Sequence, residues 1–274
     1  MGRMTQAQKA ERVRQLHRGG DVLVLANAWD CASAKIVELA GYPAIATSSA
    51  GVAFSLGYAD GQRIPMEEMI EAVRRIAACV AVPVSADLEA GYGDMAKAAA
   101  ALVDSGAVGL NLEDCEGGRS DGMVETVRQC ERIRGVKRVG EERGVPLVLN
   151  ARTELYLAQV GDPADRFERA YERLRAYIEA GADCVFVPGI SDEDLIRRFV
   201  EELRFPLNVL ATAATPPLAR LREIGVARVS VGSGLARAAL GYARRAAEAL
   251  RATGNFDALF AEAIPFAEIN GMFR

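Results

Sequence analysis

The feature that most constrains the fold is an eightfold alternation of short apolar runs with longer amphipathic segments. Most of the runs are continuously apolar, as strands buried on both faces are, so they predict the strands of a parallel sheet. They are Val22–Ala26, Ala44–Ser48, Val82–Asp87, Val108–Glu113, Leu147–Arg152, Cys184–Val187, Leu207–Ala211 and Val229–Gly232.

Helices are predicted between these runs, where apolar residues recur at helical spacing and charged residues occupy the other side. The clearest examples are Pro65–Val80, Met95–Ser105, Val124–Arg143 and Pro163–Ala180. A glycine lies just past several helical segments, at the position where a left-handed residue commonly ends a helix. These glycines are Gly41, Gly106, Gly144, Gly181 and Gly225.

Eight β–α units without a break in composition predict an α/β fold, a single (β/α)₈ TIM barrel that spans residues 1–274. A doubly wound open sheet is the alternative, but eight regular units over this length favour closure. An additional helix is predicted within residues 1–20, at Thr5–Arg18, and a helical extension within residues 253–274, at Asn255–Ile269.

Composition excludes several classes of function. Half of the 274 residues are hydrophobic and the net charge is −4, so a large core is available and no nucleic-acid or membrane partner is indicated. The five cysteines lack Cys-x-x-Cys spacing, which argues against disulfides and zinc and favours a reducing cytoplasm. Because there is no apolar run of about 18 residues and no signal-peptide pattern, we expect a cytoplasmic protein.

Acidic residues follow two of the predicted strands. Asp87 and Glu89 are two residues apart and would project from the same face of a strand, while Glu113 ends the next strand and Asp60 is a further acid. Acids that meet without basic neighbours repel one another unless a divalent cation lies between them. Oxygen ligands favour Mg²⁺ or Mn²⁺ over zinc. The alternative is that these acids cap helices or lie in solvated turns.

The residue types at the strand ends exclude other chemistries. The only histidine, His17, lies in the predicted N-terminal helix, and we expect it at the surface, so histidine-dependent triads are disfavoured. Lysine is absent from the predicted strand ends, which excludes a Schiff-base nucleophile there. Metal-assisted chemistry on a 2-oxo acid is what the remaining residues favour.

Arg152 is the basic residue at a strand end, and its guanidinium group would bind a substrate carboxylate with two hydrogen bonds. A structural ion pair with one of the barrel acids is the alternative. Backbone N–H groups near Ser48 and Ser49 would bind a developing oxyanion, although both serines also suit a turn. Asn208, at a later strand end, is a further candidate for substrate binding.

With these residues the chain resembles the isocitrate lyase/phosphoenolpyruvate mutase superfamily over about residues 22–235. The combination of an acid-x-acid-x-Gly-Tyr-Gly segment, a Glu-Asp strand end and an Ala-Arg-Thr strand end is what makes the resemblance specific. The matching segments are Asn27–Asp30, Ala44–Ala53, Gly57–Asp60, Ala86–Gly93, Leu112–Asp114 and Asn150–Thr153.

The resemblance implies a barrel with a catalytic Mg²⁺ near a 2-oxo acid or its enolate. It implies that Asp87 contacts the metal and that Glu89, Glu113 and Asp60 act largely through water. It also implies a homodimer or homotetramer in which a C-terminal helix packs on a neighbouring subunit, a use for the extension at Asn255–Ile269.

For the substrate, the resemblance implies that Arg152 clamps a carboxylate and that Ser48, Ser49 and Ala50 form the oxyanion-binding segment. The chain departs from the family in the loop after the fourth strand. Family lyases carry a Lys-Lys/Arg-Cys-Gly-His motif there, whereas Cys115–Gly122 lacks it.

Three hypotheses follow. The first is a Mg²⁺-dependent lyase that cleaves a carbon–carbon bond or decarboxylates a small 2-oxo or 2-hydroxy carboxylate, with Arg119, Ser120 or Asp121 of the loop excluding water and relaying a proton. The second is a phosphonate or carboxyphosphonate mutase or hydrolase, which acts on a P–C bond. The third is a weakly active 2-oxo acid binding protein that has lost the proton donor.

Overall fold

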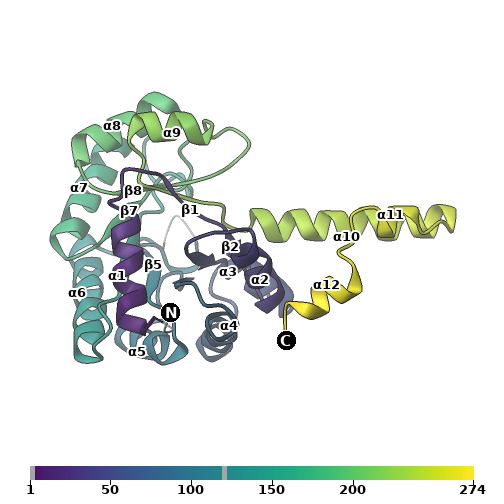
Figure 1. The fold of residues 1–274 in the computed structure, drawn as a ribbon. Coiled ribbons are helices and arrows are strands. Elements are labelled where there is room, and N and C mark those ends of the chain that lie inside the picture. Colours follow the sequence, from purple (N-terminus) through teal and green to yellow (C-terminus); the bar gives the residue numbers. More distant parts are fainter. Residues whose placement is uncertain (1–3, 119–121) are drawn as a thin grey trace.

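The computed structural model describes residues 4–118 and 122–274, in which parallel strands form one sheet that curves into a barrel surrounded by helices (Figure 1). The predicted (β/α)₈ barrel is therefore confirmed, and each predicted run contains or overlaps a strand. The strands are β1 (Leu23–Leu25), β2 (Asn27–Ala28), β3 (Ile45–Thr47), β4 (Val84–Asp87), β5 (Gly109–Glu113), β6 (Val148–Arg152), β7 (Cys184–Phe186), β8 (Leu207–Leu210) and β9 (Arg228–Ser230).

The barrel closes where the chain around the first predicted run forms two strands. β1 pairs with β9, and β2, which follows after one residue, pairs with β3. Asn27 joins the two edges: its Oδ1 accepts hydrogen bonds from the N–H groups of Val231 (2.9 Å) and Gly232 (3.0 Å), and its Nδ2 donates to the carbonyl of Thr47 (2.8 Å). Residues 23–28 thus contain both β1 and β2, the first and last strands in the order of the sheet.

The helices lie where helical spacing predicts them. The five predicted glycines all have positive φ angles, between 68° and 109°, which confirms their place at helix ends. The helices are α1 (Gln6–Leu16), α2 (Cys31–Leu39), α3 (Ser49–Ser55), α4 (Met66–Cys79), α5 (Met95–Ser105), α6 (Thr126–Glu142), α7 (Arg166–Glu179), α8 (Glu193–Leu203), α9 (Leu218–Ile224), α10 (Gly234–Thr253), α11 (Asp257–Phe260), α12 (Phe266–Gly271) and the 3₁₀ turn η1 (Glu116–Gly118).

Residues alternate along the strands between two buried environments. On β5, Leu110 and Leu112 are fully buried and belong to the main hydrophobic core, whereas Asn111 between them hydrogen-bonds to Asn150 of β6. The two asparagines, with Arg228 of β9, belong to a polar network that links the strands. Polar groups therefore lie on the face of the sheet opposite to the apolar core.

The C-terminal segment extends away from the barrel (Figure 1). α10 forms a long arm that carries α11, and α12 follows. The single helix predicted over Asn255–Ile269 is wrong in detail, because Pro265 starts α12 and separates it from α11. Phe256, Phe260 and Phe266 are exposed on this segment. Packing on a neighbouring subunit stays a prediction.

Among the described residues, the structure contains no helix that is both long and apolar enough to cross a bilayer.

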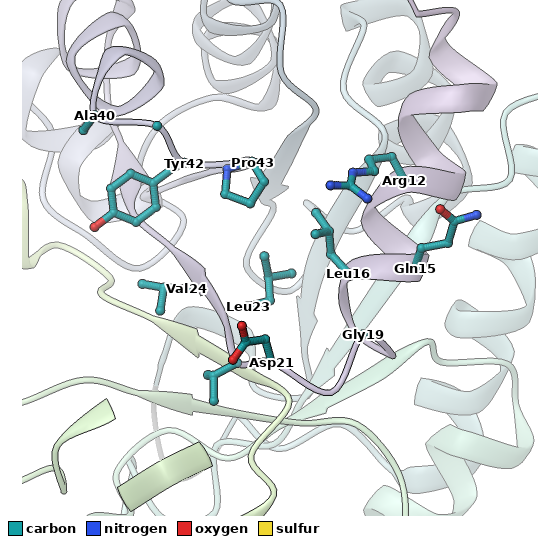
Figure 2. A pocket seen from close by; sticks show the side chains of 12 residues that line it. Arg12, Gln15, Leu16, Gly19, Asp21, Leu23, Val24, Ala40, Tyr42 and Pro43 are labelled. Carbon is teal, nitrogen blue, oxygen red and sulfur yellow. The ribbon is translucent and has the colours of Figure 1, made fainter. Parts of the chain in front are cut away.

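A pocket of about 520 Å³ lies at the N-terminal end of the barrel, between α1 and the segment that leads into β3 (Figure 2). Arg12 and Leu16 of α1, Leu23 of β1, and Tyr42 and Pro43 contribute to its walls. Catalytic groups of TIM barrels lie at the opposite end, so this pocket does not mark the candidate active site.

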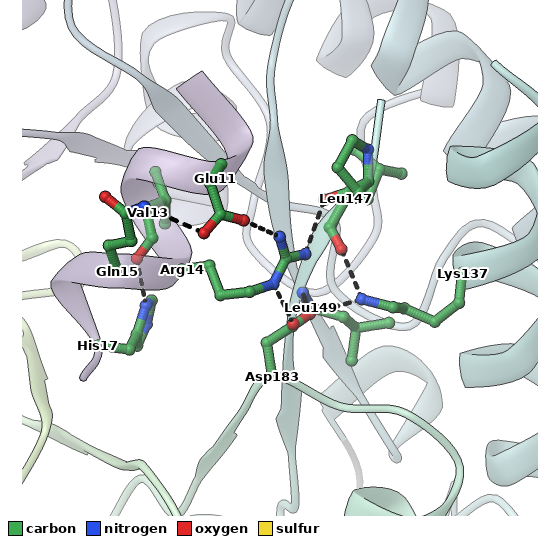
Figure 3. Close-up of polar contacts among 10 residues, drawn as sticks. Glu11, Val13, Arg14, Gln15, His17, Lys137, Leu147, Leu149 and Asp183 are labelled. Atoms are coloured by element: carbon green, nitrogen blue, oxygen red, sulfur yellow. Dashed lines mark hydrogen bonds and ion pairs between the residues drawn. The ribbon is translucent and has the colours of Figure 1, made fainter. Parts of the chain in front are cut away.

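Asp183 fixes α1 to the N-terminal end of the barrel (Figure 3). Its carboxylate accepts hydrogen bonds from Arg14 Nε (2.9 Å), Lys137 Nζ (2.7 Å) and the backbone N–H of Leu149 (2.8 Å). The Asp183 side chain is only 10% exposed, so both cations depend on a carboxylate that is largely shielded from water.

The expectation that His17 lies at the surface is wrong. The residue is 6% exposed, and its Nδ1 lies 2.8 Å from the carbonyl oxygen of Val13 (Figure 3). Burial, together with the nearby positive charge of Arg228, lowers the pKa of His17 to about 4. The last turn of α1 faces the barrel, which is why a polar residue near the end of that helix is enclosed.

We expect Asp183→Ala to lower the free energy of unfolding by about 3–5 kcal/mol, because it leaves Lys137 without a carboxylate and Arg14 with only the more exposed Glu11. Chemical denaturation at neutral pH measures this change. Asp104→Ala is the matched control, since it removes an aspartate that pairs with Arg143 on the exposed surface. Equal losses in the two variants would contradict the anchoring role of Asp183.

We also expect the stability that depends on His17 to fall as the pH drops from about 6.5 towards 4. The unfolded chain takes up a proton near the ordinary pKa of 6.5, whereas the folded protein does so only near 4. The free energy of unfolding, measured relative to His17→Gln, should decrease by up to ~1.4 kcal/mol per pH unit in this window. Parallel pH curves for the two proteins would disprove the assignment.

Candidate active site

Several strand-end acids predicted from the sequence meet at the carboxyl end of the barrel, around a pocket of about 190 Å³. Larger hollows lie elsewhere, one beside α1 and one of about 720 Å³ beside α2 and α4. We assign the site to the smaller pocket because buried charged side chains gather there. Its walls are formed by Ser49, Asp60, Gly61, Glu89, Glu113, Arg152, Glu154, Leu157 and Ala158.

Asp87 ends β4, and its carboxylate is held on one side only. Its Oδ2 accepts a hydrogen bond from Ser49 Oγ (2.9 Å), and its backbone N–H donates to Thr47 Oγ1 (3.0 Å). The side chain is buried, and its Oδ1 has no hydrogen-bond partner among the described residues. A buried carboxylate oxygen without a partner is costly, so this atom is available to a ligand.

Glu89 lies on a tight turn that follows β4. It adopts a left-handed backbone conformation (φ 49°), as do Gly91 (φ 85°) and Tyr92 (φ 55°). The positive φ of Gly91 favours glycine there, and a Cβ atom would also lie 2.4 Å from Met95 Sδ. Burial and the negative charges of Asp87 and Asp60 raise the pKa of Glu89 to about 7. The expectation that Asp87 and Glu89 project from one face of a strand is wrong, because β4 ends at Asp87 and Glu89 reaches the pocket from the turn.

Arg152 ends β6 and lies between two buried carboxylates. Glu113, its neighbour in the register of β5 and β6, places Oε2 3.3 Å from Arg152 Nη2. Glu154 contacts Nε from the other side, and the ring of Phe186 lies 5.5 Å from the guanidinium carbon. The ion pair considered as an alternative for Arg152 is thus present, and the guanidinium group still lines the pocket.

These contacts determine the charges of the pair. Burial raises the pKa of Glu113 well above its ordinary value. Burial alone would lower the pKa of Arg152, but the charges of Glu113 and Glu154 outweigh it and raise that pKa. Arg152 therefore stays charged at any physiological pH.

Asp114, which follows Glu113 at the same strand end, points away from the pocket. It is fully buried and accepts hydrogen bonds from Tyr177 (2.7 Å), Arg173 (3.3 Å) and the backbone N–H of Glu154 (2.9 Å). Adjacent residues on a strand face opposite sides, so one acid of the Glu-Asp motif faces the site and the other holds α7 against the barrel.

The predicted oxyanion-binding segment forms the start of α3. Ser48 caps the helix, because its Oγ accepts a hydrogen bond from the N–H of Gly51 (3.1 Å), while its own N–H donates to Ala28 (2.9 Å). Ser49 and Ala50 occupy the first helical positions, whose N–H groups have no acceptor within the helix. Ser48 thus shapes the segment, and direct contact between Ser48 and a substrate stays a prediction.

The remaining predicted residues differ in position. Asp60 lies in the loop after α3 and lines the pocket, where loss of water and the nearby charge of Asp87 raise its pKa. Asn208 is fully buried, hydrogen-bonds to Ser230 (3.1 Å), and does not line the pocket. Arg119 and Ser120 lie outside the described residues. Glu154, which the sequence analysis missed, lines the pocket beyond the end of β6.

Direct ligation of a metal ion by three acids is not found within residues 4–118 and 122–274. The residues instead fit an ion held by one carboxylate. Asp87 Oδ1 is a buried oxygen without a partner in the described structure, and the surrounding donors are oxygen atoms, the set that suits Mg²⁺ or Mn²⁺.

The chain is similar to known proteins in both sequence and structure. A family model described as phosphoenolpyruvate phosphomutase matches residues 13–251. An uncharacterized protein of Mycobacterium tuberculosis (strain ATCC 25618 / H37Rv) is 36% identical over 256 residues, which cover 93% of each chain. The 2-methylisocitrate lyase of Escherichia coli (strain K12) is 31% identical over 196 residues, which cover 67% of this chain and 64% of that protein.

Two solved structures share the fold. A protein from Burkholderia cenocepacia J2315, provisionally named a lyase/mutase, has a TM-score of 0.89 and 37% identity and covers 98% of this chain and 96% of its own. A phosphonopyruvate hydrolase solved with oxalate and Mg²⁺ has a TM-score of 0.85 and 25% identity over 98% of this chain and 95% of its own. The chain therefore belongs to the phosphoenolpyruvate phosphomutase family, and it is an enzyme of the isocitrate lyase/phosphoenolpyruvate mutase superfamily of lyases and mutases.

Proposed function

We propose that this enzyme is a Mg²⁺-dependent lyase that cleaves a carbon–carbon bond in a small 2-oxo or 2-hydroxy carboxylate. The observation that carries the proposal is Asp87 Oδ1, a buried oxygen without a partner among the described residues. The other oxygen of that carboxylate accepts a hydrogen bond from Ser49, which lines the same pocket as Arg152. The relationship to a 2-methylisocitrate lyase supports the reaction type. The hydrolase solved with oxalate and Mg²⁺ supports the metal.

The charge of the pocket supports the need for a cation. Asp60, Glu89, Glu113 and Glu154 line it together with one basic residue of the described chain, Arg152. An anionic substrate would be repelled by this excess of acids, even where burial raises the pKa of some of them. A divalent cation reverses the balance and makes binding of a carboxylate favourable.

In this proposal Asp87 holds Mg²⁺ directly, and Glu89, Glu113 and Asp60 hold it through water. Mn²⁺ would suit the same oxygen donors. When bound, the ion would offset the negative charge that develops on the substrate oxygens as the bond breaks. Ser49 keeps the Asp87 carboxylate in place through its hydrogen bond to Oδ2 (2.9 Å).

The chain's own residues bind and orient the substrate. Arg152 binds a carboxylate through the part of its guanidinium group that faces the pocket. The N–H groups of Ser49 and Ala50, at the start of α3, stabilise the oxygen on which charge develops. Cleavage leaves the bonding electrons on a carbon that must then receive a proton, and the loop that contains Arg119 and Ser120 is our candidate source.

The walls of the pocket favour a small substrate. Leu157 and Ala158 add apolar surface to the walls, and the volume is about 190 Å³. Further carboxylates on a substrate would require further cations, and Arg152 is the only basic wall residue in the described part of the chain. We therefore favour a 2-oxo or 2-hydroxy acid with a short substituent over a tricarboxylate.

Cleavage of a P–C bond is the second candidate, because the phosphonopyruvate hydrolase aligns with nearly the whole chain. A phosphonate group has more charged oxygens than a carboxylate and would need more cationic contacts than the described walls supply. The charge of the pocket thus ranks this reaction below carbon–carbon cleavage.

Product analysis by NMR tests both candidates. We expect the protein with Mg²⁺ to convert at least one member of a panel of oxaloacetate, isocitrate, methylisocitrate, 2-oxoglutarate and phosphonopyruvate, with carbon–carbon cleavage products. A chelator should abolish turnover. Asp87→Ala should do the same and remove Mg²⁺ binding while circular dichroism shows a folded barrel, because it deletes the direct ligand.

Asp94→Ala is the matched control for that variant, since Asp94 caps α5 and is separate from the pocket walls. Full activity in Asp87→Ala would reject the metal assignment. Conversion of phosphonopyruvate alone would favour the second candidate, and ligand-induced thermal shifts without any product would indicate a weakly active binding protein.

Arg152→Lys should weaken binding of oxalate in the presence of Mg²⁺ by roughly tenfold or more, because an ammonium group cannot reproduce the planar fork of a guanidinium. Isothermal titration calorimetry measures the affinity. Arg220→Lys is the control, because Arg220 pairs with Glu193 on the surface. Unchanged affinity in Arg152→Lys would argue against the carboxylate clamp.

A further inference from the structure

We propose that Glu154 is a positioning residue that fixes the orientation of Arg152 and so determines which part of its guanidinium group faces the pocket. Glu154 is 3% exposed and contacts Arg152 Nε, yet it lies beyond the end of β6, outside every segment that carries the family resemblance. The inference rests on the proposed function, in which Arg152 binds a substrate carboxylate.

The contacts around Arg152 leave one part of the group for a ligand. Glu154 engages Nε and Glu113 approaches Nη2 at 3.3 Å, and neither ion pair involves Nη1. The Phe186 ring lies 5.5 Å from the guanidinium carbon and adds a third neighbour. A planar group with carboxylates at two of its nitrogens has one favourable orientation, and here that orientation keeps Arg152 in the pocket wall.

The backbone of Glu154 is anchored by Asp114. Its backbone N–H donates to Asp114 Oδ1 at 2.9 Å. Asp114 is fully buried and is held in turn by Tyr177 (2.7 Å) and Arg173 (3.3 Å) of α7. These contacts hold the backbone of Glu154 against α7 independently of Arg152. The position of Glu154 therefore does not depend on the arginine that its carboxylate contacts.

Positioning and simple electrostatics predict opposite effects for loss of this acid. Removal of a negative charge from an acid-rich pocket should strengthen binding of an anion if charge alone matters. If Glu154 orients Arg152, its removal frees Nε and lets the guanidinium group turn towards Glu113 and Asp87, which weakens binding of an anion. Glu154→Gln separates the two effects, since an amide oxygen still accepts a hydrogen bond from Nε while the charge is lost.

The first test measures Arg152 in the protein without a ligand. Phenylglyoxal modifies accessible arginines, and peptide mass spectrometry reports the rate at Arg152 itself. We expect the same modification rate at Arg152 in the wild type and in Glu154→Gln, and a different rate in Glu154→Ala, because only the alanine variant removes the acceptor that holds Nε. Equal rates in all three proteins would overturn the positioning role, whatever reaction the enzyme catalyses.

The second test measures oxalate binding with Mg²⁺ by calorimetry. We expect Glu154→Ala to bind oxalate roughly 10- to 100-fold more weakly than the wild type, as loss of a supporting partner typically causes. Glu154→Gln should bind oxalate at least as tightly as the wild type when Mg²⁺ is saturating. Glu193→Ala is the matched control, because it removes the same kind of glutamate–arginine pair from the surface.

The outcomes separate this inference from the proposed function. Tighter oxalate binding by Glu154→Ala would show that charge alone matters and would overturn the positioning role. A wild type that binds no oxalate with Mg²⁺ would overturn the proposed function, and the phenylglyoxal rates would still decide the role of Glu154. If Glu154→Ala does not fold, Glu154→Asp replaces it, because the shorter acid keeps the charge and falls short of Nε.

Discussion

The arrangement at the barrel mouth depends on the positive charge of Arg152, because acids that share a buried pocket would otherwise repel one another and retain protons. Glu113 and Glu154 bracket its guanidinium group, and their charges keep it ionised despite burial. Burial and the negative charges of Asp87 and Asp60 outweigh the influence of Arg152 and raise the pKa of Glu89 to about 7. The same imbalance makes the pocket suited to a divalent cation and unsuited to an anion without one.

The scaffold fixes these charges by strand pairing. Glu113 and Arg152 are direct neighbours in the register of β5 and β6, so their side chains meet as soon as those strands pair. Asp114 then ties the same strand end to α7 through Tyr177 and Arg173. Because the acids sit on strand ends and on tight turns next to them, the electrostatic pattern is preorganised before any ligand binds.

The sequence predicted the barrel and most of the mouth, because carboxyl ends of parallel strands must meet at one end. It assigned Glu113 and not Asp114 to the site, in agreement with strand alternation, which places adjacent residues on opposite sides. Glu154 was missed because it lies two residues beyond Arg152, the last residue of β6, and the search for site residues stopped at the strand end. His17 was misplaced because its burial depends on how α1 packs against the barrel, a tertiary contact that helical spacing does not reveal.

Arg228 links the two ends of the barrel electrostatically. It is 1% exposed and donates to Asn111 Oδ1 (3.1 Å), which also accepts from Asn150 Nδ2 (2.9 Å). Burial lowers the pKa of Arg228 to about 10, against the opposing influence of Cys184 and Asp87, so the group remains charged at neutral pH. The positive charge of Arg228 attracts the Asp87 carboxylate at the mouth. The same charge helps to keep His17 neutral at the other end of the barrel. The buried guanidinium group of Arg228 thus influences titratable groups at both ends of the barrel.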